Sequence, residues 1–282
     1  MPDPELSPCA AELRRHDPDR FLTALFAPEK RRESLFALYA FNLEVARVRE
    51  AVTEPMLGRI RLQWWREAID GIYAGSPRRH YVTDPLAQAV TQHELSRDLF
   101  DRLIDAREAD LEPQGPETLA ALRGYAEGSS STLVELAMEL LSDGAPGPEL
   151  RQAGRQVGIA WALVGLLRAV PFHARQRRLY LPADLVDEAG LRVRDVFELR
   201  RVPALSTVVK EVAEAARAEL AAARAGPRPP RRLLPALLPG TLAGLYLRRL
   251  AAAGYDPFDP RVGEAPPLRA ARLVVAQIRG RI

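Results

Sequence analysis

The sequence predicts an all-α protein. Apolar residues recur at spacings of three and four along most of the chain, which places them on one face of a helix. The alternating runs of β-branched residues that are typical of strands are missing. The chain has 282 residues, of which 47% are hydrophobic and 27% are charged, a composition typical of a folded globular protein. We expect one large helical domain over residues 13–282, preceded by a flexible tail over residues 1–12.

The first two long helices have recognisable boundaries. Pro28 followed by Glu29 is a favourable helix start, and apolar residues then recur as far as Val52. The second helix covers "PMLGRIRLQWWREAIDGIYAG", where Gly75 is the stop signal. Five apolar residues of this second helix form the stripe that we expect to face the core: Leu57, Ile60, Trp64, Ala68 and Ile72.

Further helices follow in the rest of the chain. Four segments have helical periodicity: "DPLAQAVTQHEL", "SRDLFDRLIDAREADLE", "GPETLAALRGYAEGSSSTLVELAMELL" and "PELRQAGRQVGIAWALVGLLRAV". Shorter helices are predicted at 194–199 and 203–225. The proline-rich stretch "AGPRPPRRLLP" predicts a loop, after which "TLAGLYLRRLAAAG" resumes the helical pattern.

Composition excludes several classes of function. A single cysteine, Cys9, cannot form an intramolecular disulfide or a four-thiolate zinc site. The four histidines lack the spacing of metal ligands. The basic charge is almost entirely arginine, spread along the chain rather than clustered with aromatic residues, which argues against nucleic-acid binding.

The predicted location follows from apolar length and charge. No run of residues is long and apolar enough to span a membrane, and the N-terminus resembles neither a signal peptide nor a presequence. We therefore expect a cytoplasmic protein, or one peripheral to the inner membrane. The stretches "RPPRRLL" and "YLRRL" are candidates for contact with anionic lipid, and solvated surface arginine is the alternative.

Six segments, in order along residues 20–258, resemble the squalene/phytoene synthase family. They are "APEKRRESLFALYAF", "LQWWREAIDGIYAG", "FDRLIDAREADL", "LRGYAEGSSSTLVELA", "LLRAVPFHARQRRLYLP" and "YLRRLAAAGYDPF". The resemblance implies a single helical bundle of the isoprenoid (terpenoid) synthase type with a central cavity. Enzymes of this family condense two prenyl diphosphates, and two pairs of aspartates, each pair four residues apart, hold the Mg²⁺ that stabilises the leaving diphosphate.

Both aspartate pairs are missing from this chain. The first pair corresponds to Ala46 and Glu50, and the second pair corresponds to Ala169 and His173. Of four metal-binding carboxylates, Glu50 is the one survivor. The resemblance thus implies no confident catalytic residue, no metal site and no cofactor. Mg²⁺ would be needed only if the chain is an active enzyme.

Residues near these positions also differ from the family pattern. The arginine that precedes the first pair corresponds to Leu43, and the asparagine near the second pair corresponds to Gly165. Pro171 falls between the two positions of the second pair, and a proline inside a helix removes a hydrogen bond and kinks the helix. We therefore expect the second motif to differ in backbone geometry as well as in ligands.

Several polar residues remain as candidates for binding a ligand or a phosphate group. They are Tyr39, Glu50, Tyr125, Arg168, His173, Arg175, Arg178 and Tyr180. The alternative is that the tyrosines and arginines stabilise the fold through hydrogen bonds and ion pairs between helices. No acidic residue stands within a helical turn of His173, so we expect a hydrogen-bonded polar residue there rather than a metal ligand or a base.

The departures themselves resemble a non-catalytic branch of the family, exemplified by a mitochondrial complex I assembly factor. The segments "LYAFNLEVARVRE", "RLQWWREAIDGIY", "YAEGSSSTL" and "LLRAVPFHARQRRLYLP" carry this resemblance. It implies a non-enzymatic role in the assembly of NADH:ubiquinone oxidoreductase, with a complex I subunit or assembly intermediate as the partner. The lack of a presequence indicates a bacterial relative.

Two alternatives stay open. One is an active prenyl transferase that acts on farnesyl or geranylgeranyl diphosphate in isoprenoid biosynthesis, with Glu50, Glu44, Asp105 or Asp110 as substitute ligands. Asp105 and Asp110 are poor substitutes, because a spacing of five residues places them on different faces of a helix. The other alternative is a carrier that holds an isoprenoid or a lipid in the central cavity without chemistry.

Overall fold

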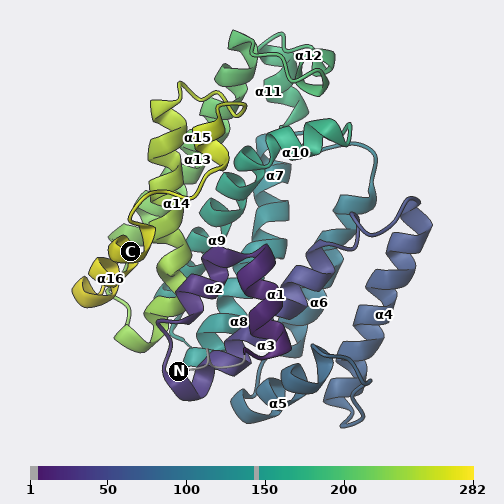
Figure 1. Cartoon of the computed structure of the whole chain (residues 1–282), viewed down its shortest axis with the longest axis vertical. Coiled ribbons are helices and arrows are strands. Elements are labelled where there is room, and N and C mark those ends of the chain that lie inside the picture. The colour runs from purple at the N-terminus through teal and green to yellow at the C-terminus, as the bar shows by residue number, and fades with distance from the viewer. Residues whose placement is uncertain (1–5, 143–145) are drawn as a thin grey trace.

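The computed structural model describes residues 6–142 and 146–282, and within these ranges it contains helices and no strand (Figure 1). The predicted all-α class is therefore confirmed. The α-helices up to the first gap are α1 (Pro8–His16), α2 (Pro18–Ala24), α3 (Glu29–Ala46), α4 (Pro55–Tyr73), α5 (Thr83–His93), α6 (Arg97–Ala106), α7 (Leu119–Ala126) and α8 (Thr132–Leu141). Those after it are α9 (Pro148–Arg168), α10 (Val170–Arg175), α11 (Ala183–Glu188), α12 (Val193–Phe197), α13 (Pro203–Ala225), α14 (Leu234–Ala252), α15 (Pro260–Gly263) and α16 (Arg269–Arg279). Short 3₁₀-helices cover Arg107–Leu111 (η1) and Arg231–Leu233 (η3), and a π-helical turn covers Glu127–Ser131 (η2).

The N-terminal segment differs from the expected flexible tail. Helix α1 begins at Pro8, and the Ser7 hydroxyl caps it by accepting a hydrogen bond from the Ala10 amide at 3.2 Å. Cys9 and Leu13 are buried where α1 packs on α3. The tail predicted as far as residue 12 was thus wrong from Pro8 onward, because a nine-residue helix offers too short an apolar stripe to identify from sequence. Residues 1–5 lie outside the described residues.

Helix α3 begins where it was predicted and ends earlier. Pro28 is its N-cap residue, but the helix ends at Ala46 instead of continuing to Val52. Residues 47–50 form turns, in which the Ala51 amide donates to the Arg47 carbonyl at 3.1 Å. The first motif position is therefore divided between the last helical residue, Ala46, and a turn that carries Glu50.

Helix α4 has the predicted bounds but turns a different face inward at its start. Leu57 and Ile60 are 46% and 59% exposed, whereas Gly58 and Leu62 are buried. Gly58 explains this choice, because a Cβ atom there would lie 2.4 Å from Leu111 Cδ2. Helix α4 can therefore pack closely against η1 only if Gly58 faces Leu111. The expected stripe was wrong at Leu57 and Ile60.

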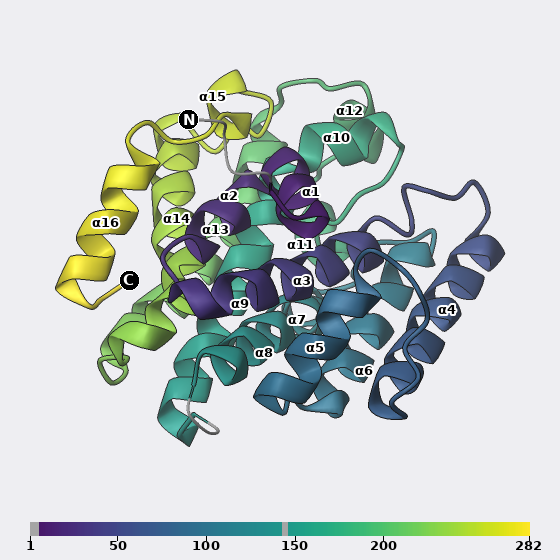
Figure 2. The same cartoon turned by 60° about the horizontal axis from the view of Figure 1, so that its bottom comes forward.

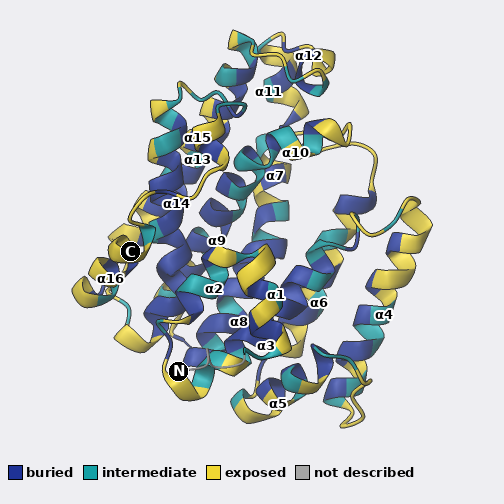
Figure 3. Cartoon of the chain, in the orientation of Figure 1, coloured by how far each residue is buried: buried dark blue, intermediate teal, exposed yellow. Residues whose placement is uncertain are grey.

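Helix α9 runs through the middle of the molecule and organises the core (Figures 1 and 2). It contacts α7, η2 and α8 along one side and α13 and α14 along another. Gly158 permits the closest of these approaches, because a Cβ atom on it would lie 2.4 Å from Ser131 Cα in η2. Residues of α9 that face these neighbours are buried, as the dark blue segments of Figure 3 show.

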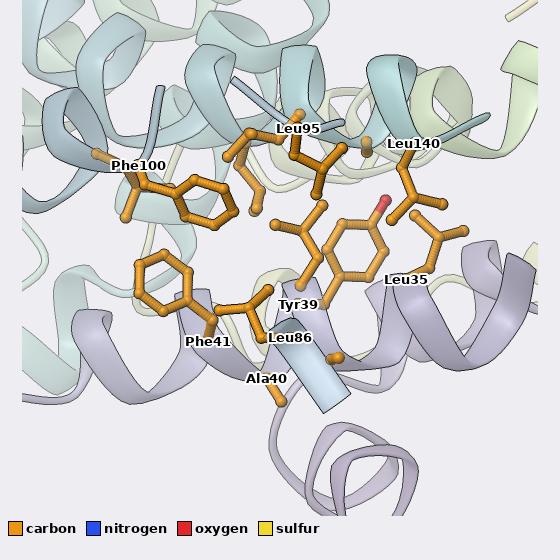
Figure 4. Close-up of a cluster of buried hydrophobic side chains, with 14 of the residues drawn as sticks. Leu35, Tyr39, Ala40, Phe41, Leu86, Leu95, Phe100 and Leu140 are labelled. Atoms are coloured by element: carbon orange, nitrogen blue, oxygen red, sulfur yellow. The ribbon is translucent and has the colours of Figure 1, made fainter. Parts of the chain in front are cut away.

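Side chains from the N-terminal half form a second part of the core. In Figure 4, Phe41 and Leu35 of α3 lie opposite Phe100, Leu95 and Leu140. The rings of Phe41 and Phe100 meet edge to face, with centroids 5.3 Å apart. This packing holds α3, and with it the first motif position, against α6 and α8.

The predicted loop over residues 225–235 is confirmed only in part, because η3 covers Arg231–Leu233 and α14 begins at Leu234, before the expected restart at Thr241. Two helices that the sequence did not reveal, α15 and α16, follow. Residues 226–230 are irregular, and α14 then packs on α9. Helix α16 lies on the outer side of α14, at the edge of the molecule in both Figure 1 and Figure 2. Across the described ranges, no helix has the length and apolar character that crossing a membrane requires.

Candidate functional site

The second motif position lies at a break between two helices. Helix α9 ends at Arg168, and α10 begins at Val170 with Pro171 in its first turn. The interruption predicted from Pro171 is therefore confirmed. Ala169 and His173 are still one turn apart, since the His173 amide donates to the Ala169 carbonyl at 2.9 Å. The one-turn spacing between the two motif residues is thus retained, although neither residue carries a carboxylate.

A buried carboxylate from another part of the chain lies at the centre of this region. Asp110, in η1, is only 6% exposed. Its Oδ1 atom accepts hydrogen bonds from the hydroxyls of Tyr125 and Tyr180, each at 2.8 Å. Arg107 donates to the Tyr125 hydroxyl at 2.8 Å and approaches Asp110 Oδ2 at 3.4 Å. We call these four residues the Asp110 network, and it joins η1, α7 and the segment that follows α10.

The sequence suggested Asp110 only as a poor substitute ligand, and the direction of its side chain explains why its role as a buried acceptor was missed. Asp105 and Asp110 do lie on different faces, as expected, and Asp105 pairs with Arg66 at 2.8 Å on the surface. The chain tightens from the α6 helix into the 3₁₀-helix η1 between them. Three residues per turn in place of 3.6 change which residues face inward. Asp110 thereby becomes a buried acceptor rather than a substitute metal ligand.

The two tyrosines are held in their protonated form. Burial raises the pKa of Tyr180, and the neighbouring Asp110 carboxylate raises it further. Burial likewise raises the pKa of Tyr125 well above its ordinary value, against the opposing effect of Arg107. Both hydroxyls therefore remain donors near neutral pH, which is what a shared carboxylate acceptor requires.

His173 packs beside the Asp110 network. Its ring centroid lies 4.6 Å from that of Tyr180. Burial lowers the pKa of His173 to about 4, and Arg178 contributes to this although Asp110 opposes it. Among the described residues, its buried Nδ1 atom has no hydrogen-bond partner. The expected hydrogen bond is absent at Nδ1, and the ring is neutral at pH 7.

A cavity of about 550 Å³ opens next to this network. Its polar side chains come from Glu112, Gln114, Tyr125, Arg178 and Tyr180, and Leu122 and Leu179 contribute apolar surface. Arg178 is held at the rim, where it donates to the Glu112 carbonyl at 3.2 Å. Of the candidate residues, the structure therefore brings together Tyr125, His173, Arg178 and Tyr180.

The first motif position lines a separate cavity of about 590 Å³. Its charged side chains include Glu44 and Glu50, together with Arg47 and Arg61. Glu44 accepts a hydrogen bond from the Tyr81 hydroxyl at 2.5 Å. The carboxylates are thus accompanied by an equal number of arginines. Neither this cavity nor the one beside Tyr180 is lined by residues from both motif positions.

The remaining candidates lie away from both cavities. Tyr39 is buried in the core, where its ring lies among apolar side chains (Figure 4). Arg168 stacks on the Tyr246 ring at 3.5 Å and approaches the buried Asp19 carboxylate at 3.7 Å. Arg175 is exposed on α10. Arg168 thus forms an ion pair between two helices, which is the alternative to ligand binding that the sequence left open.

The side chains at the motif positions do not fit a magnesium diphosphate site. Mg²⁺ prefers six oxygen ligands, and the family meets this with paired carboxylates. The four positions here offer Ala46, Glu50, Ala169 and His173, so only one carboxylate is present. Within residues 6–142 and 146–282, no three His, Cys, Asp or Glu side chains gather in a way that would hold a metal ion.

Known proteins resemble this chain in sequence and in fold. The squalene/phytoene synthase family model matches residues 13–275. The chain is 32% identical to NADH dehydrogenase (ubiquinone) complex I, assembly factor 6, of Bos taurus, over 89% of this chain and 75% of that protein. It is 28% identical to a presqualene diphosphate synthase of Rhodopseudomonas palustris, over 81% of each. The crystal structure of a dehydrosqualene synthase superposes with a TM-score of 0.82 at 16% identity, covering 96% of this chain and 94% of that one.

These matches extend over nearly the whole of the described helical domain. The sequence match to the family model starts within α1 and ends within α16. The fold expected from the resemblance, an all-α bundle of the isoprenoid synthase type, is the fold observed. The chain belongs to the squalene/phytoene synthase family.

Proposed function

We propose that this chain is a non-enzymatic assembly factor for respiratory complex I, the NADH:ubiquinone oxidoreductase. It would act in the cytoplasm or at the surface of the inner membrane, on a complex I subunit or an assembly intermediate. The observation that carries the proposal is the state of the two motif positions. One carboxylate remains of four, Glu50, and the residues that line its cavity include none from the second motif position.

The chemistry of the family supports this proposal. Ionising a prenyl diphosphate requires positive charge at the leaving group, which metal ions supply in this family. At the second position, Ala169 has no ligand atom, and the neutral His173 ring packs against Tyr180. The buried Asp110 carboxylate, which acts on His173, already accepts two tyrosine hydrogen bonds. The similarity to complex I assembly factor 6 proteins, at 30–32% identity in four mammals, points to the same role.

Deletion of the gene in the organism that encodes the chain tests the proposal. We expect NADH:ubiquinone oxidoreductase activity in isolated membranes to fall and to return when the wild-type gene is restored. Glu50→Ala is the informative variant, because Glu50 is the one carboxylate left at the motif positions and is exposed in a turn. An assembly factor with Glu50→Ala should restore the activity fully, whereas a metal-dependent enzyme with this change should not.

A binding measurement addresses the alternative of an active transferase. We expect titration of the purified chain with farnesyl diphosphate to show no binding that depends on Mg²⁺. Binding that requires Mg²⁺, or release of diphosphate, would overturn the proposal in favour of a prenyl transferase. Mass spectrometry of an organic extract of the purified chain would reveal a bound isoprenoid, and an unchanged complex I in the deletion strain together with such a ligand would favour a carrier.

A further inference from the structure

Helix α16 presents an apolar face to the outside of the molecule. Its inner residues, Leu273 and Ala276, are buried where the helix packs on α14. The outer apolar residues are exposed: Leu268 (76%), Val274 (45%), Val275 (41%) and Ile278 (65%). Val274, Val275 and Ile278 lie within about one and a half helical turns. With Leu268, the N-cap residue of α16, they form a patch rather than the scattered exposure that is normal on a surface.

The part of the chain around α16 is rich in arginine, and the three acidic residues just before it, Asp256, Asp259 and Glu264, pair with Arg201, Arg261 and Arg249. Residues 220–255 contain six arginines, residues 265–282 contain four, and neither range contains an aspartate or a glutamate. The whole chain has a net charge of only +3, so the positive charge is concentrated in this region. Arg272 and Arg279 flank the apolar residues of α16 and are exposed. In the described part of the chain, neither of these two arginines forms an ion pair.

Other arginines converge on the C-terminal end of α16. Arg231 donates to the Ile278 carbonyl at 3.4 Å, Arg228 to the Gly280 carbonyl at 3.3 Å, and Arg224 to the Ile282 carbonyl at 3.2 Å. The carbonyl groups at this end of a helix carry partial negative charge, which favours the guanidinium groups there. Burial lowers the pKa of Arg224, and the neighbouring Arg248 lowers it further.

We propose that α16 binds the surface of an anionic lipid bilayer. The binding surface, called here the α16 face, consists of Leu268, Val274, Val275 and Ile278 with Arg272 and Arg279 beside them. An amphipathic basic helix lies in the plane of a membrane, with its apolar side chains below the headgroups and its arginines at the level of the phosphates. Guanidinium groups match phosphate oxygens through paired hydrogen bonds. This inference gives the proposed location at the inner membrane a specific surface, and it does not depend on a role in complex I assembly.

Charge complementarity favours lipid over a protein as the occupant. Another exposed apolar stretch, with Leu57 and Ile60 on α4, lies among charges of both signs. Arg59 pairs there with Glu112 at 3.0 Å, and Arg66 pairs with Glu108 at 2.6 Å. A surface with paired charges of both signs has no general attraction for a negative bilayer. The α16 face has no acidic residue in its own segment, so its attraction to anionic phosphate is unopposed there.

Vesicle flotation of the full chain tests this proposal. The vesicles are phosphatidylcholine alone, or phosphatidylcholine mixed with phosphatidylglycerol, at about 0.1 M salt. We expect binding to the anionic vesicles and little to the neutral ones, and we expect salt at about 0.5 M to weaken it by screening. Ile278→Glu should reduce the fraction bound about tenfold or more, because it places a carboxylate in the apolar part of the face.

Ile60→Glu on α4 is the matched control. Ile60 is 59% exposed, close to the 65% of Ile278, and α4 and α16 lie on opposite sides of the molecule in Figures 1 and 2. The control should change binding less than about twofold, and neither variant should unfold the chain, since both positions are on the surface. Equal loss of binding in both variants, or equal binding to neutral and anionic vesicles, would overturn the proposal. So would a wild-type dimer that Ile278→Glu converts to a monomer without any vesicle binding.

Discussion

Replacing Asp110 by alanine should destabilise the protein strongly. The Asp110 carboxylate accepts hydrogen bonds from Tyr125 and Tyr180 and lies 3.4 Å from the mostly buried Arg107. Each hydrogen bond to a charged group contributes about 1.5–3 kcal/mol. Removing one partner of a buried ion pair costs about 3–5 kcal/mol, because the remaining charge and donors stay buried without a partner. We therefore expect Asp110→Ala to lower the free energy of unfolding by about 3–5 kcal/mol.

The assay is differential scanning calorimetry of the purified variants. For a chain of this size, about 1 kcal/mol corresponds to roughly 2 °C in Tm, so Asp110→Ala should lower Tm by about 6–10 °C. Asp110→Asn keeps one acceptor oxygen for the two tyrosine hydroxyls and loses the negative charge. Its effect should fall between that of the wild type and that of the alanine variant. Far-UV circular dichroism should remain helical for both variants at low temperature.

Asp105→Ala is the control that could refute this reasoning. It removes the same side chain five residues earlier, from a carboxylate that is 64% exposed and bonded to Arg66. Arg66 keeps Glu108 as a partner at 2.6 Å, so the loss should be less than about 1 kcal/mol. If Asp110→Ala lowered Tm no more than Asp105→Ala, the Asp110 network would not stabilise this region.

Three further predictions concern other sites. Gly158→Ala should lower the free energy of unfolding by about 1–3 kcal/mol in thermal unfolding, because the added Cβ meets the Ser131 backbone. Gly165 has open space around it, so Gly165→Ala should be neutral or slightly stabilising in the same measurement. The pKa of His173 is about 4 in the folded chain and near 6.5 in the unfolded chain, so the free energy of unfolding should fall by up to about 3 kcal/mol as the pH drops from 6.5 to 4. In urea titrations, His173→Gln should reduce this dependence on pH. Burial raises the pKa of the Cys9 thiol to about 12, so iodoacetamide at pH 8 should alkylate it only after unfolding, and fast labelling of the native chain would contradict its burial.

Much of the helical framework could be predicted because its signals are local. The starts of α4, α9 and α13 each carry a proline in the first turn, where the missing amide hydrogen costs nothing. The break after Arg168 follows from Pro171 in the same way. The short helices α1, α2 and α11 were missed because six to nine residues show too few repeats of the helical period.

The candidate site was predicted in part. Tyr125, His173, Arg178 and Tyr180 do gather, but Tyr39 lies in the core, and Arg168 contacts Tyr246 and Asp19 instead. The residue that organises the cluster, Asp110, is 70 positions from Tyr180 in the chain. Its inward direction depends on a 3₁₀ turn and on two tyrosines brought by other segments, neither of which leaves a pattern in the local sequence.

The sequence by itself determined the class of the fold, the positions of most long helices and the loss of the family's metal-binding carboxylates. These properties depend on the type of each residue and on spacings of a few positions, which the chain displays directly. Tertiary structure alone decided which side of α4 is buried, through the contact of Gly58 with Leu111, and that α16 exposes both Ile278 and Arg272. Burial depends on which segments pack together, and those segments lie tens to hundreds of residues apart in the chain.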